Sequence, residues 1–119
     1  MHEMALGSAV VNTATKHARG RPVKVVTLSV GKLRQVVPDS LLFYFDIIAK
    51  GTCCEGARLD IQVVPALLRC ATCENEWEPD FPTFRCPFCT DGKVSVLSGE
   101  EFMVESLEVE EDESCIAPK

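Results

Sequence analysis

The segment Cys70-Ala-Thr-Cys73, followed after twelve residues by Cys86-Pro-Phe-Cys89, decides how the second half of this chain folds. Each Cys-x-x-Cys turn brings two sulfur atoms onto one edge of a tetrahedron, and the intervening residues let the second turn fold back to supply the other edge. This spacing is typical of a structural Zn(II) site with four thiolate ligands. The alternatives are two disulfides, which would suit a secreted protein, and four free thiols, for which the spacing would be a coincidence.

The chain as a whole is short, acidic and ordinarily hydrophobic. It has 119 residues, of which 46% are hydrophobic, and a formal net charge of −6. This length predicts one modest core plus a small metal-held module, and the acidic charge argues against broad nucleic-acid binding, which relies on surplus Lys and Arg. No apolar stretch is long enough to span a bilayer, and seven cysteines without a signal peptide indicate a reducing compartment. We therefore expect a cytoplasmic protein with no membrane or nucleic-acid partner.

Hydrophobic periodicity predicts an α+β fold. Helices are expected over residues 4–19 and from Pro38 to Gly51, and strands over residues 23–30, 58–64, 94–97 and 102–109. The simplest packing places the two helices on one face of a small, mainly antiparallel sheet, with a zinc-ribbon-like module inserted between two sheet strands. The expected parts are a discontinuous α+β domain (residues 1–68 and 93–113), a zinc-binding module (residues 69–92) and an acidic flexible tail (residues 110–119).

Alternation and helical spacing also predict which side chains share a face. The sets expected to share one are Val26, Leu28 and Val30 in the first strand, Leu41, Leu42, Phe45, Ile48 and Ala49 as an apolar stripe on the second helix, and Met103, Glu105, Leu107 and Val109 in the last strand. In the strand over residues 58–64, Leu59, Ile61 and Val63 are expected to face a core. The zinc segment is rich in aromatic residues, which we expect to pack around the metal turns: Trp77, Phe81, Phe84 and Phe88. Stacking on nucleic-acid bases is the alternative, and five acidic residues against two arginines in that segment disfavour it.

The start of the chain, Met1-His2-Glu3, is a second candidate metal site. The α-amino nitrogen, the backbone nitrogen of His2 and its imidazole can reach one metal together, and Glu3 can add a carboxylate. Surroundings rich in nitrogen favour Cu(II) or Ni(II) over Zn(II). From these residues alone the pattern is weak, because most histidines at this position bind nothing.

The two motifs together resemble the HypA family of nickel-incorporation proteins. The resemblance rests on Met1-His2-Glu3-Met4 opening a helix, on Cys70-x-x-Cys73 with Cys86-Pro-x-Cys89, and on the length and element order of the chain. It implies a nickel metallochaperone for [NiFe]-hydrogenase maturation, with transported Ni(II) at His2, Glu3 and Met1 and structural Zn(II) at the four cysteines. The implied partners are a HypB-type GTPase and the hydrogenase large subunit, and some relatives also serve urease.

Several residues fall outside this assignment. Asp39 lies near the start of the second helix, where some relatives carry an acidic residue implicated in nickel binding, but the register does not fix its equivalence. Relatives often carry histidines beside the second zinc motif; this chain has none, and His17 on the first helix is expected to be structural or exposed. Cys53, Cys54 and Cys115 are expected to be thiols without a metal role, although exposed ones would permit a homo-oligomer.

Two other classes of function compete with the metallochaperone. One is a zinc-ribbon protein-interaction module without metal delivery, which would bind one zinc and no second metal. The other is an enzyme, which is disfavoured because a closed four-thiolate site leaves no water on the zinc. The sequence also lacks a Ser/His/Asp grouping and a glycine-rich phosphate loop, so we expect no catalytic activity.

Overall fold

The computed structural model describes residues 3–79, 85–89 and 93–114. Its contacts divide the chain into two compact units. The first comprises Met1–Ser29, Val36–Gln62 and Met103–Lys119, and the second comprises Val30–Gln35 and Val63–Phe102. Each unit contains a three-stranded sheet, with strand order β2-β1-β6 in the first and β4-β3-β5 in the second.

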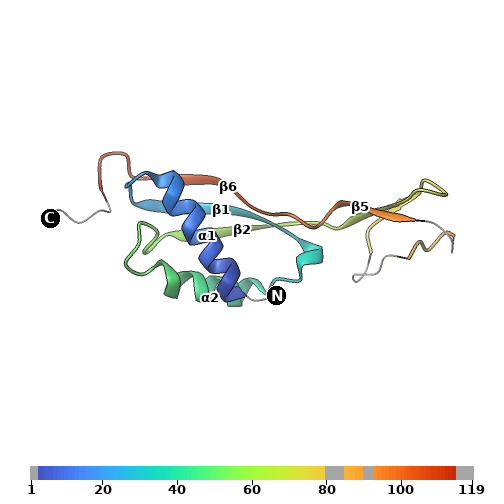
Figure 1. The fold of residues 1–119 in the computed structure, drawn as a ribbon, viewed down its shortest axis with the longest axis horizontal. Helices are drawn as coiled ribbons and strands as arrows, with labels where there is room; N and C mark the ends of the chain where they lie inside the picture. Colours follow the sequence, from blue (N-terminus) through green and yellow to red (C-terminus); the bar gives the residue numbers. More distant parts are fainter. Residues whose placement is uncertain (1–2, 80–84, 90–92, 115–119) are drawn as a thin grey trace. The chain divides into compact units, whose positions relative to one another are not determined.

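Two helices form one layer of the first unit (Figure 1). Helix α1 (Glu3–Ala18) ends where Arg19 adopts a left-handed conformation with φ of 54°, which stops the helical hydrogen-bond ladder. Helix α2 (Pro38–Ala49) begins with a proline in its first turn, as the sequence predicts, because proline needs no hydrogen-bond acceptor there. The two helices pack closely where Gly7 lies against α2, since a Cβ at Gly7 would be 3.2 Å from Ile48 Cδ1.

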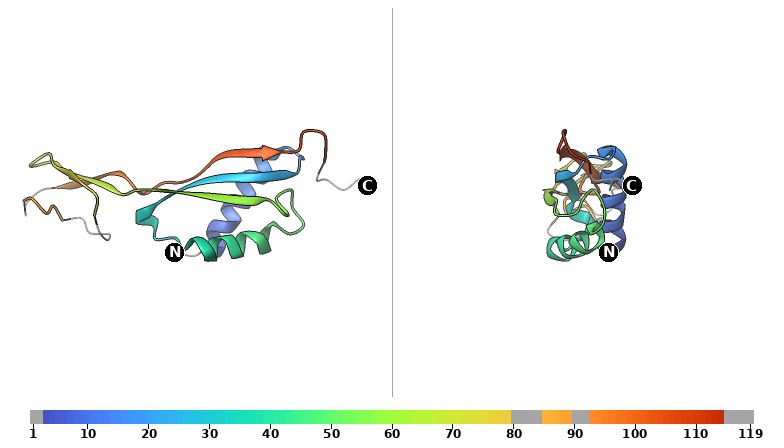
Figure 2. Two further views of the ribbon diagram at one scale, coloured as in Figure 1. Left: turned by 180° about the vertical axis from the view of Figure 1, so that it is seen from behind. Right: turned by 90° about the vertical axis from the view of Figure 1, so that its left-hand side faces the viewer.

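The sheet beside these helices is formed by β1 (Val23–Gly31), β2 (Arg58–Val64) and β6 (Phe102–Val109), with β1 in the centre. Figure 2 shows that β1 and β2 run in the same direction and that β6 runs opposite to them. The α2 crossover between β1 and β2 explains the parallel pair, because parallel neighbours need a long connection. The core is formed by α1, α2, β1 and β2, through Val10, Val11, Ala14, Ala18, Val26, Leu28, Leu41, Phe45, Ala49 and Leu59.

The second unit contains β3 (Leu67–Cys70), β4 (Glu76–Trp77) and β5 (Val94–Ser98), paired antiparallel. In the register of this sheet Leu68 lies opposite Trp77 on one side and Val96 on the other. The sequence predicted neither β3 nor β4, because each is too short to show a period. The sequence did predict a strand over residues 94–97, which corresponds to β5, but it did not indicate that this strand pairs with β3.

Within the second unit, the segment that follows β1 makes a close backbone contact with the turn at Gly99. The short 3₁₀ helix η1 (Lys32–Arg34) follows β1, and the Leu33 N–H donates to the Gly99 carbonyl oxygen at 2.8 Å. The Arg34 Nε–H donates to the Glu100 carbonyl oxygen at 2.7 Å. Gly99 has a φ of +114°, and a Cβ on it would lie 2.7 Å from the Ala66 Cα atom. Glycine is therefore required at this turn by both conformation and space.

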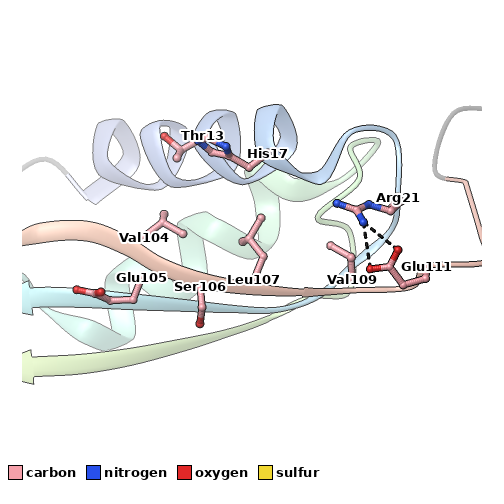
Figure 3. Close-up of a pocket in the computed structure, with 9 residues that line it drawn as sticks. All are labelled: Thr13, His17, Arg21, Val104, Glu105, Ser106, Leu107, Val109 and Glu111. Carbon is pink, nitrogen blue, oxygen red and sulfur yellow. Dashed lines mark hydrogen bonds and ion pairs between the residues drawn. The ribbon is translucent and has the colours of Figure 1, made fainter.

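Two predictions from alternation are wrong. Val63, which was expected to face a core, is 57% exposed. On β6, Met103 is 52% exposed, and Val104, together with Leu107 and Val109, points toward α1, so Met103 and Glu105 do not share a face with Leu107 and Val109 (Figure 3). Residues 104 and 107 differ in parity, and the simple alternation of the strand is therefore interrupted between them.

Two further features of the first unit bear on its surface. Helix α2 leaves large apolar side chains in solvent, with Phe43 61% exposed and Ile47 47% exposed. The acidic tail begins with fixed contacts: the Glu110 N–H donates to the Pro22 carbonyl oxygen at 2.9 Å, and Glu111 pairs with Arg21 at 2.9 Å. No helix within the described residues is long and apolar enough to cross a membrane.

Candidate metal centre

The four predicted cysteines come together in the second unit. Cys70 is the last residue of β3, Cys73 follows in the adjoining turn, and Cys86 and Cys89 belong to the second turn. The Cys70 and Cys89 sulfur atoms are 3.4 Å apart, and those of Cys73 and Cys86 are 3.6 Å apart. All four sulfur atoms lie within 4.8 Å of one another. Two cysteines are buried and two are partly accessible, so the cluster lies just below the surface.

These distances suit a tetrahedral metal ion. With Zn–S bonds of about 2.3 Å, the sulfur atoms of a regular tetrahedron are separated by roughly 3.8 Å, close to the shorter pairs observed. Four thiolates would complete the coordination, leaving no open position for water or substrate. The donor set and its spacing therefore fit a structural Zn(II), and the residues that would hold it are Cys70, Cys73, Cys86 and Cys89.

Backbone and side-chain donors around the sulfur atoms favour their negatively charged form. Cys86 Sγ accepts hydrogen bonds from the Phe88 and Cys89 N–H groups, both at 3.4 Å. Cys73 Sγ accepts one from Asn75 Nδ2 at 3.3 Å. The backbone N–H of Cys73 is the main cause that lowers the pKa of the Cys70 thiol to about 6. Donors to a thiolate stabilise its charge, which is the state in which cysteine binds metal.

The chain around the first turn is fixed by backbone hydrogen bonds. The Cys70 N–H donates to the Asn75 carbonyl oxygen at 3.0 Å, and the Glu74 N–H donates to the Cys70 carbonyl oxygen at 2.8 Å. Glu74 adopts a left-handed φ of 62°, which lets the chain reverse tightly after Cys73. The aromatic packing expected here is present in part, because Trp77 and Phe88 meet edge to face with ring centroids 6.3 Å apart. Phe81 and Phe84 lie outside the described residues.

The sequence singled out the cysteines but missed the groups that support them. Asn75 was not proposed as a contributor, and its position two residues after Cys73 is the only indication that its amide could reach the sulfur. The backbone donors on Phe88 and Cys89 follow from the turn itself, since a Cys-x-x-Cys turn directs N–H groups back toward its first sulfur.

The predicted nickel residues are only partly within the described structure. Met1 and His2 lie outside it, and Glu3 is the first residue of α1. Asp39 lies in the first turn of α2 and is exposed, and His17 is exposed near the end of α1. Among the residues that the structure describes, the four-cysteine cluster is the one group of three or more metal-ligating side chains.

The remaining cysteines differ from one another. Cys54 is fully buried in the first unit, with its sulfur 3.8 Å from Thr15 Oγ1. Burial raises the pKa of the Cys54 thiol, against the opposing effect of hydrogen bonds with Thr15 and Thr52. Cys54 therefore matches the expectation of a buried thiol. Cys53 does not, because its sulfur is part of a disulfide, and Cys115 lies outside the described residues.

Comparison with known proteins identifies related sequences along most of the chain. A family model described as "Hydrogenase/urease nickel incorporation, metallochaperone, hypA" matches residues 1–109. The hydrogenase maturation factor HypA of Geotalea uraniireducens is 44% identical over 110 residues, which cover 92% of this chain and 100% of the relative. The protein of the same name from Chlorobium limicola is 39% identical over 115 residues, with 93% and 98% of the two chains covered.

Solved structures agree on the fold. The solution structure of the Ni metallochaperone HypA from Helicobacter pylori superposes with a TM-score of 0.66. The alignment covers 92% of this chain and 97% of that one, at 23% sequence identity. Similarity at this level of identity shows that the two chains share an arrangement of helices and strands.

Proposed function

The chain belongs to the HypA family of hydrogenase and urease nickel-incorporation metallochaperones, and from this premise we propose that it binds Ni(II) at Met1, His2 and Glu3 and delivers it during [NiFe]-hydrogenase maturation. The observation that carries the proposal is the family match over residues 1–109, which includes both the start of the chain and the four-cysteine cluster. In this role the protein is a carrier of cargo in the cytoplasm and performs no catalytic step.

The four cysteines would hold Zn(II) as a resident structural ion. Their sulfur atoms come from two turns that are separated in the sequence, so a bound ion would cross-link the second unit. In a unit with a small core, such a cross-link supplies stability that apolar burial alone does not.

Nickel would be held by ligands of a different kind. The α-amino nitrogen of Met1, the His2 backbone and imidazole nitrogens and the Glu3 carboxylate offer nitrogen and oxygen donors, which suit Ni(II) better than they suit Zn(II). Cu(II) binds such donors more tightly still, so ligand affinity alone does not select nickel. We infer that selectivity arises from contacts with the donor and acceptor proteins and from which metal the cell supplies.

The proposed partners in nickel delivery are a HypB-type GTPase and the large subunit of a [NiFe]-hydrogenase. Support comes from the relatives, which carry the name hydrogenase maturation factor and align along nearly their whole length. The family description also names urease, and urease is therefore a second possible recipient.

A nickel titration of the zinc-loaded protein tests the proposal. The chain should begin at Met1 with a free α-amino group and carry no tag, because preceding residues would destroy the chelate. Calorimetry and absorption in the d–d region should show about one nickel per chain for the wild type. His2→Ala should lose this binding, whereas His17→Ala, which alters the other histidine, should retain it.

Equal nickel binding by wild type and His2→Ala would refute the N-terminal site. Absence of nickel binding in both proteins, with one zinc retained, would favour a zinc-ribbon interaction module without metal delivery. The pH dependence gives a further check: the α-amine and imidazole must lose their protons to bind, so nickel affinity should fall as the pH is lowered.

A further inference from the structure

A groove lies between helix α1 and strand β6 in the first unit. It has a volume of about 480 Å³, within the range of sites that bind ligands or peptide side chains. Three half-buried apolar side chains of β6 face α1 across it: Val104, Leu107 and Val109 (Figure 3). Thr13 and His17 of α1 line the opposite side. Glu105 and Ser106 of β6 also line the groove, so its strand side combines three apolar residues with two polar ones, and its helix side is polar.

The strand that lines this groove is also the edge of its sheet. In the order β2-β1-β6, strand β6 has a hydrogen-bonded neighbour on its β1 side, and no strand within the described residues lies on the other side. Alternate N–H and C=O groups of an edge strand point outward and can pair with another chain. An open edge next to a groove bordered by a helix is the arrangement in which an extended peptide adds a strand and places alternate side chains in the groove.

The charges around the edge are mainly acidic. Arg21 at one end of the groove is already paired with Glu111, whose two carboxylate oxygens are 2.9 and 3.1 Å from Arg21 Nη1. Lys24 is paired with Glu110 at 3.2 Å. These pairs neutralise the nearby cations, and the carboxylates of Glu105 and Glu108 remain on the same strand. Glu105 accepts a hydrogen bond from the Ser29 hydroxyl at 2.8 Å, which holds it beside β1.

The two faces of β6 thus differ in chemistry. Leu107 and Val109 point toward α1, and Glu108, which lies between them, projects to the opposite face because side chains alternate along a strand. Ser106 also points away from α1 (Figure 3). A strand added beside β6 would present one set of alternate side chains to the groove beside α1. The other set would lie on the opposite face, which carries Glu108.

We propose that the edge of β6 and its groove bind an extended peptide segment of another protein, in which apolar residues alternate with Lys or Arg. The segment would pair with β6 as a fourth strand. Its apolar side chains would enter the groove, and its cationic side chains would lie on the face that carries Glu108. This proposal does not depend on where nickel binds, and its test uses no nickel.

The test uses the full-length zinc-loaded protein and an acetylated, amidated heptapeptide, Lys-Val-Lys-Val-Lys-Val-Lys, at an ionic strength of about 0.15 M. Amide hydrogen exchange measured by NMR should slow at alternate residues of Phe102–Val109 when the peptide binds, because their outward N–H groups become paired. Protection that appeared on α2 or on the second unit instead would overturn the proposal.

Two modified peptides separate strand pairing from simple charge attraction. One carries N-methyl groups on every valine and the other on every lysine, so each blocks one edge of the peptide without changing its charge. Pairing with β6 requires one edge only. One modified peptide should therefore lose at least about tenfold in affinity while the other binds. Equal binding of both would show that attraction to acidic groups alone accounts for the complex.

Protein variants locate the groove. Thr13→Trp should fill it and weaken binding at least about tenfold, whereas Asn12→Trp, on an exposed part of α1 outside the groove, should not. Glu108→Lys should weaken binding, and Glu113→Lys, which makes the same charge change beyond the strand, should have a smaller effect. Equal effects within either pair would refute the proposed site.

Discussion

Replacing Gly31 by alanine is expected to destabilise the second unit by about 3 kcal/mol, because a side chain there would collide with backbone. A Cβ at Gly31 would fall far inside contact distance of the Gly99 carbonyl group and 2.5 Å from the Glu100 nitrogen. Gly31 itself has φ of −72° and ψ of 142°, which alanine adopts without strain. The cost therefore comes from the collision and not from the conformation of Gly31.

The magnitude follows from what the collision must disrupt. Backbone atoms cannot swing aside like the end of a side chain, so the segments around Gly31 and Gly99 must separate. Separation breaks the bonds from the Gly31 N–H to the Glu101 carbonyl at 2.6 Å and from the Leu33 N–H to the Gly99 carbonyl at 2.8 Å. Each is worth about 1 kcal/mol, and overpacking adds about 1–3 kcal/mol. Alanine also lowers the conformational entropy of the unfolded chain, which stabilises the folded state by up to about 1 kcal/mol. The free energy of unfolding should therefore fall by about 3 kcal/mol in total.

Urea denaturation of the zinc-loaded protein measures this loss. Trp77 is the single tryptophan and lies in the second unit, so its fluorescence reports the unfolding of the unit that contains Gly31. Gly7→Ala is the control: its Cβ would meet the flexible end of Ile48 at 3.2 Å, and alanine improves helix propensity by about 1 kcal/mol. The free energy of unfolding of Gly7→Ala, followed by circular dichroism, should differ little from that of the wild type. A Gly31→Ala protein within about 0.5 kcal/mol of wild type would refute the reasoning.

Three further predictions concern the cysteines and the acidic tail. Removing zinc with EDTA, or the substitution Cys73→Ser, should speed amide exchange in the two cysteine turns while the helical circular dichroism persists, because both helices belong to the first unit; loss of helicity would contradict this. Burial raises the folded-state pKa of Cys54, so its contribution to stability is complete below about pH 8.5 and is lost as the pH rises through that higher pKa. Urea midpoints should therefore fall more between pH 8 and 10 for wild type than for Cys54→Ala, and parallel curves would be the contrary result. Arg21→Ala should cost less than about 1 kcal/mol, because its partner Glu111 is largely exposed; a loss above about 2 kcal/mol in urea denaturation would show that the pair stabilises the fold more than an exposed ion pair does.

The sequence predicted best those features that depend on neighbouring residues. The spacing of Cys70, Cys73, Cys86 and Cys89 is a local property, and the four sulfur atoms meet as that spacing indicates. Pro38 marks the start of α2 for an equally local reason. The resemblance to the HypA family, which combined a motif at the start of the chain with the cysteine spacing and the overall length, was confirmed by the family match over residues 1–109.

Features that depend on distant pairing could not be read in the same way. Strand β5 pairs with β3, and nothing in the sequence of Val94–Ser98 distinguishes that neighbour from a strand of the first unit. Strand β4 has two residues and shows no period at all. Alternation placed Met103 and Glu105 on one face with Leu107 and Val109, but an irregularity in β6 puts Val104 on that face instead. A one-residue shift of this kind moves the side chains on one side of it to the other face of the strand, and strict alternation gives no indication of where the shift occurs.

The distribution of ligands along the chain offers a physical reason why one metal would stay and another would leave. The four thiolates come from two turns, and hydrogen bonds to the sulfur atoms of Cys73 and Cys86 hold the ligands in place. A zinc ion bound there could escape only if the two turns separated, which requires local unfolding. Under the proposed function, nickel is bound by three consecutive residues at the start of the chain, and such ligands can be replaced one at a time by those of an acceptor. The division between structural and transported metal would then rest on ligand arrangement, since the intrinsic order of metal affinities would not favour nickel over copper.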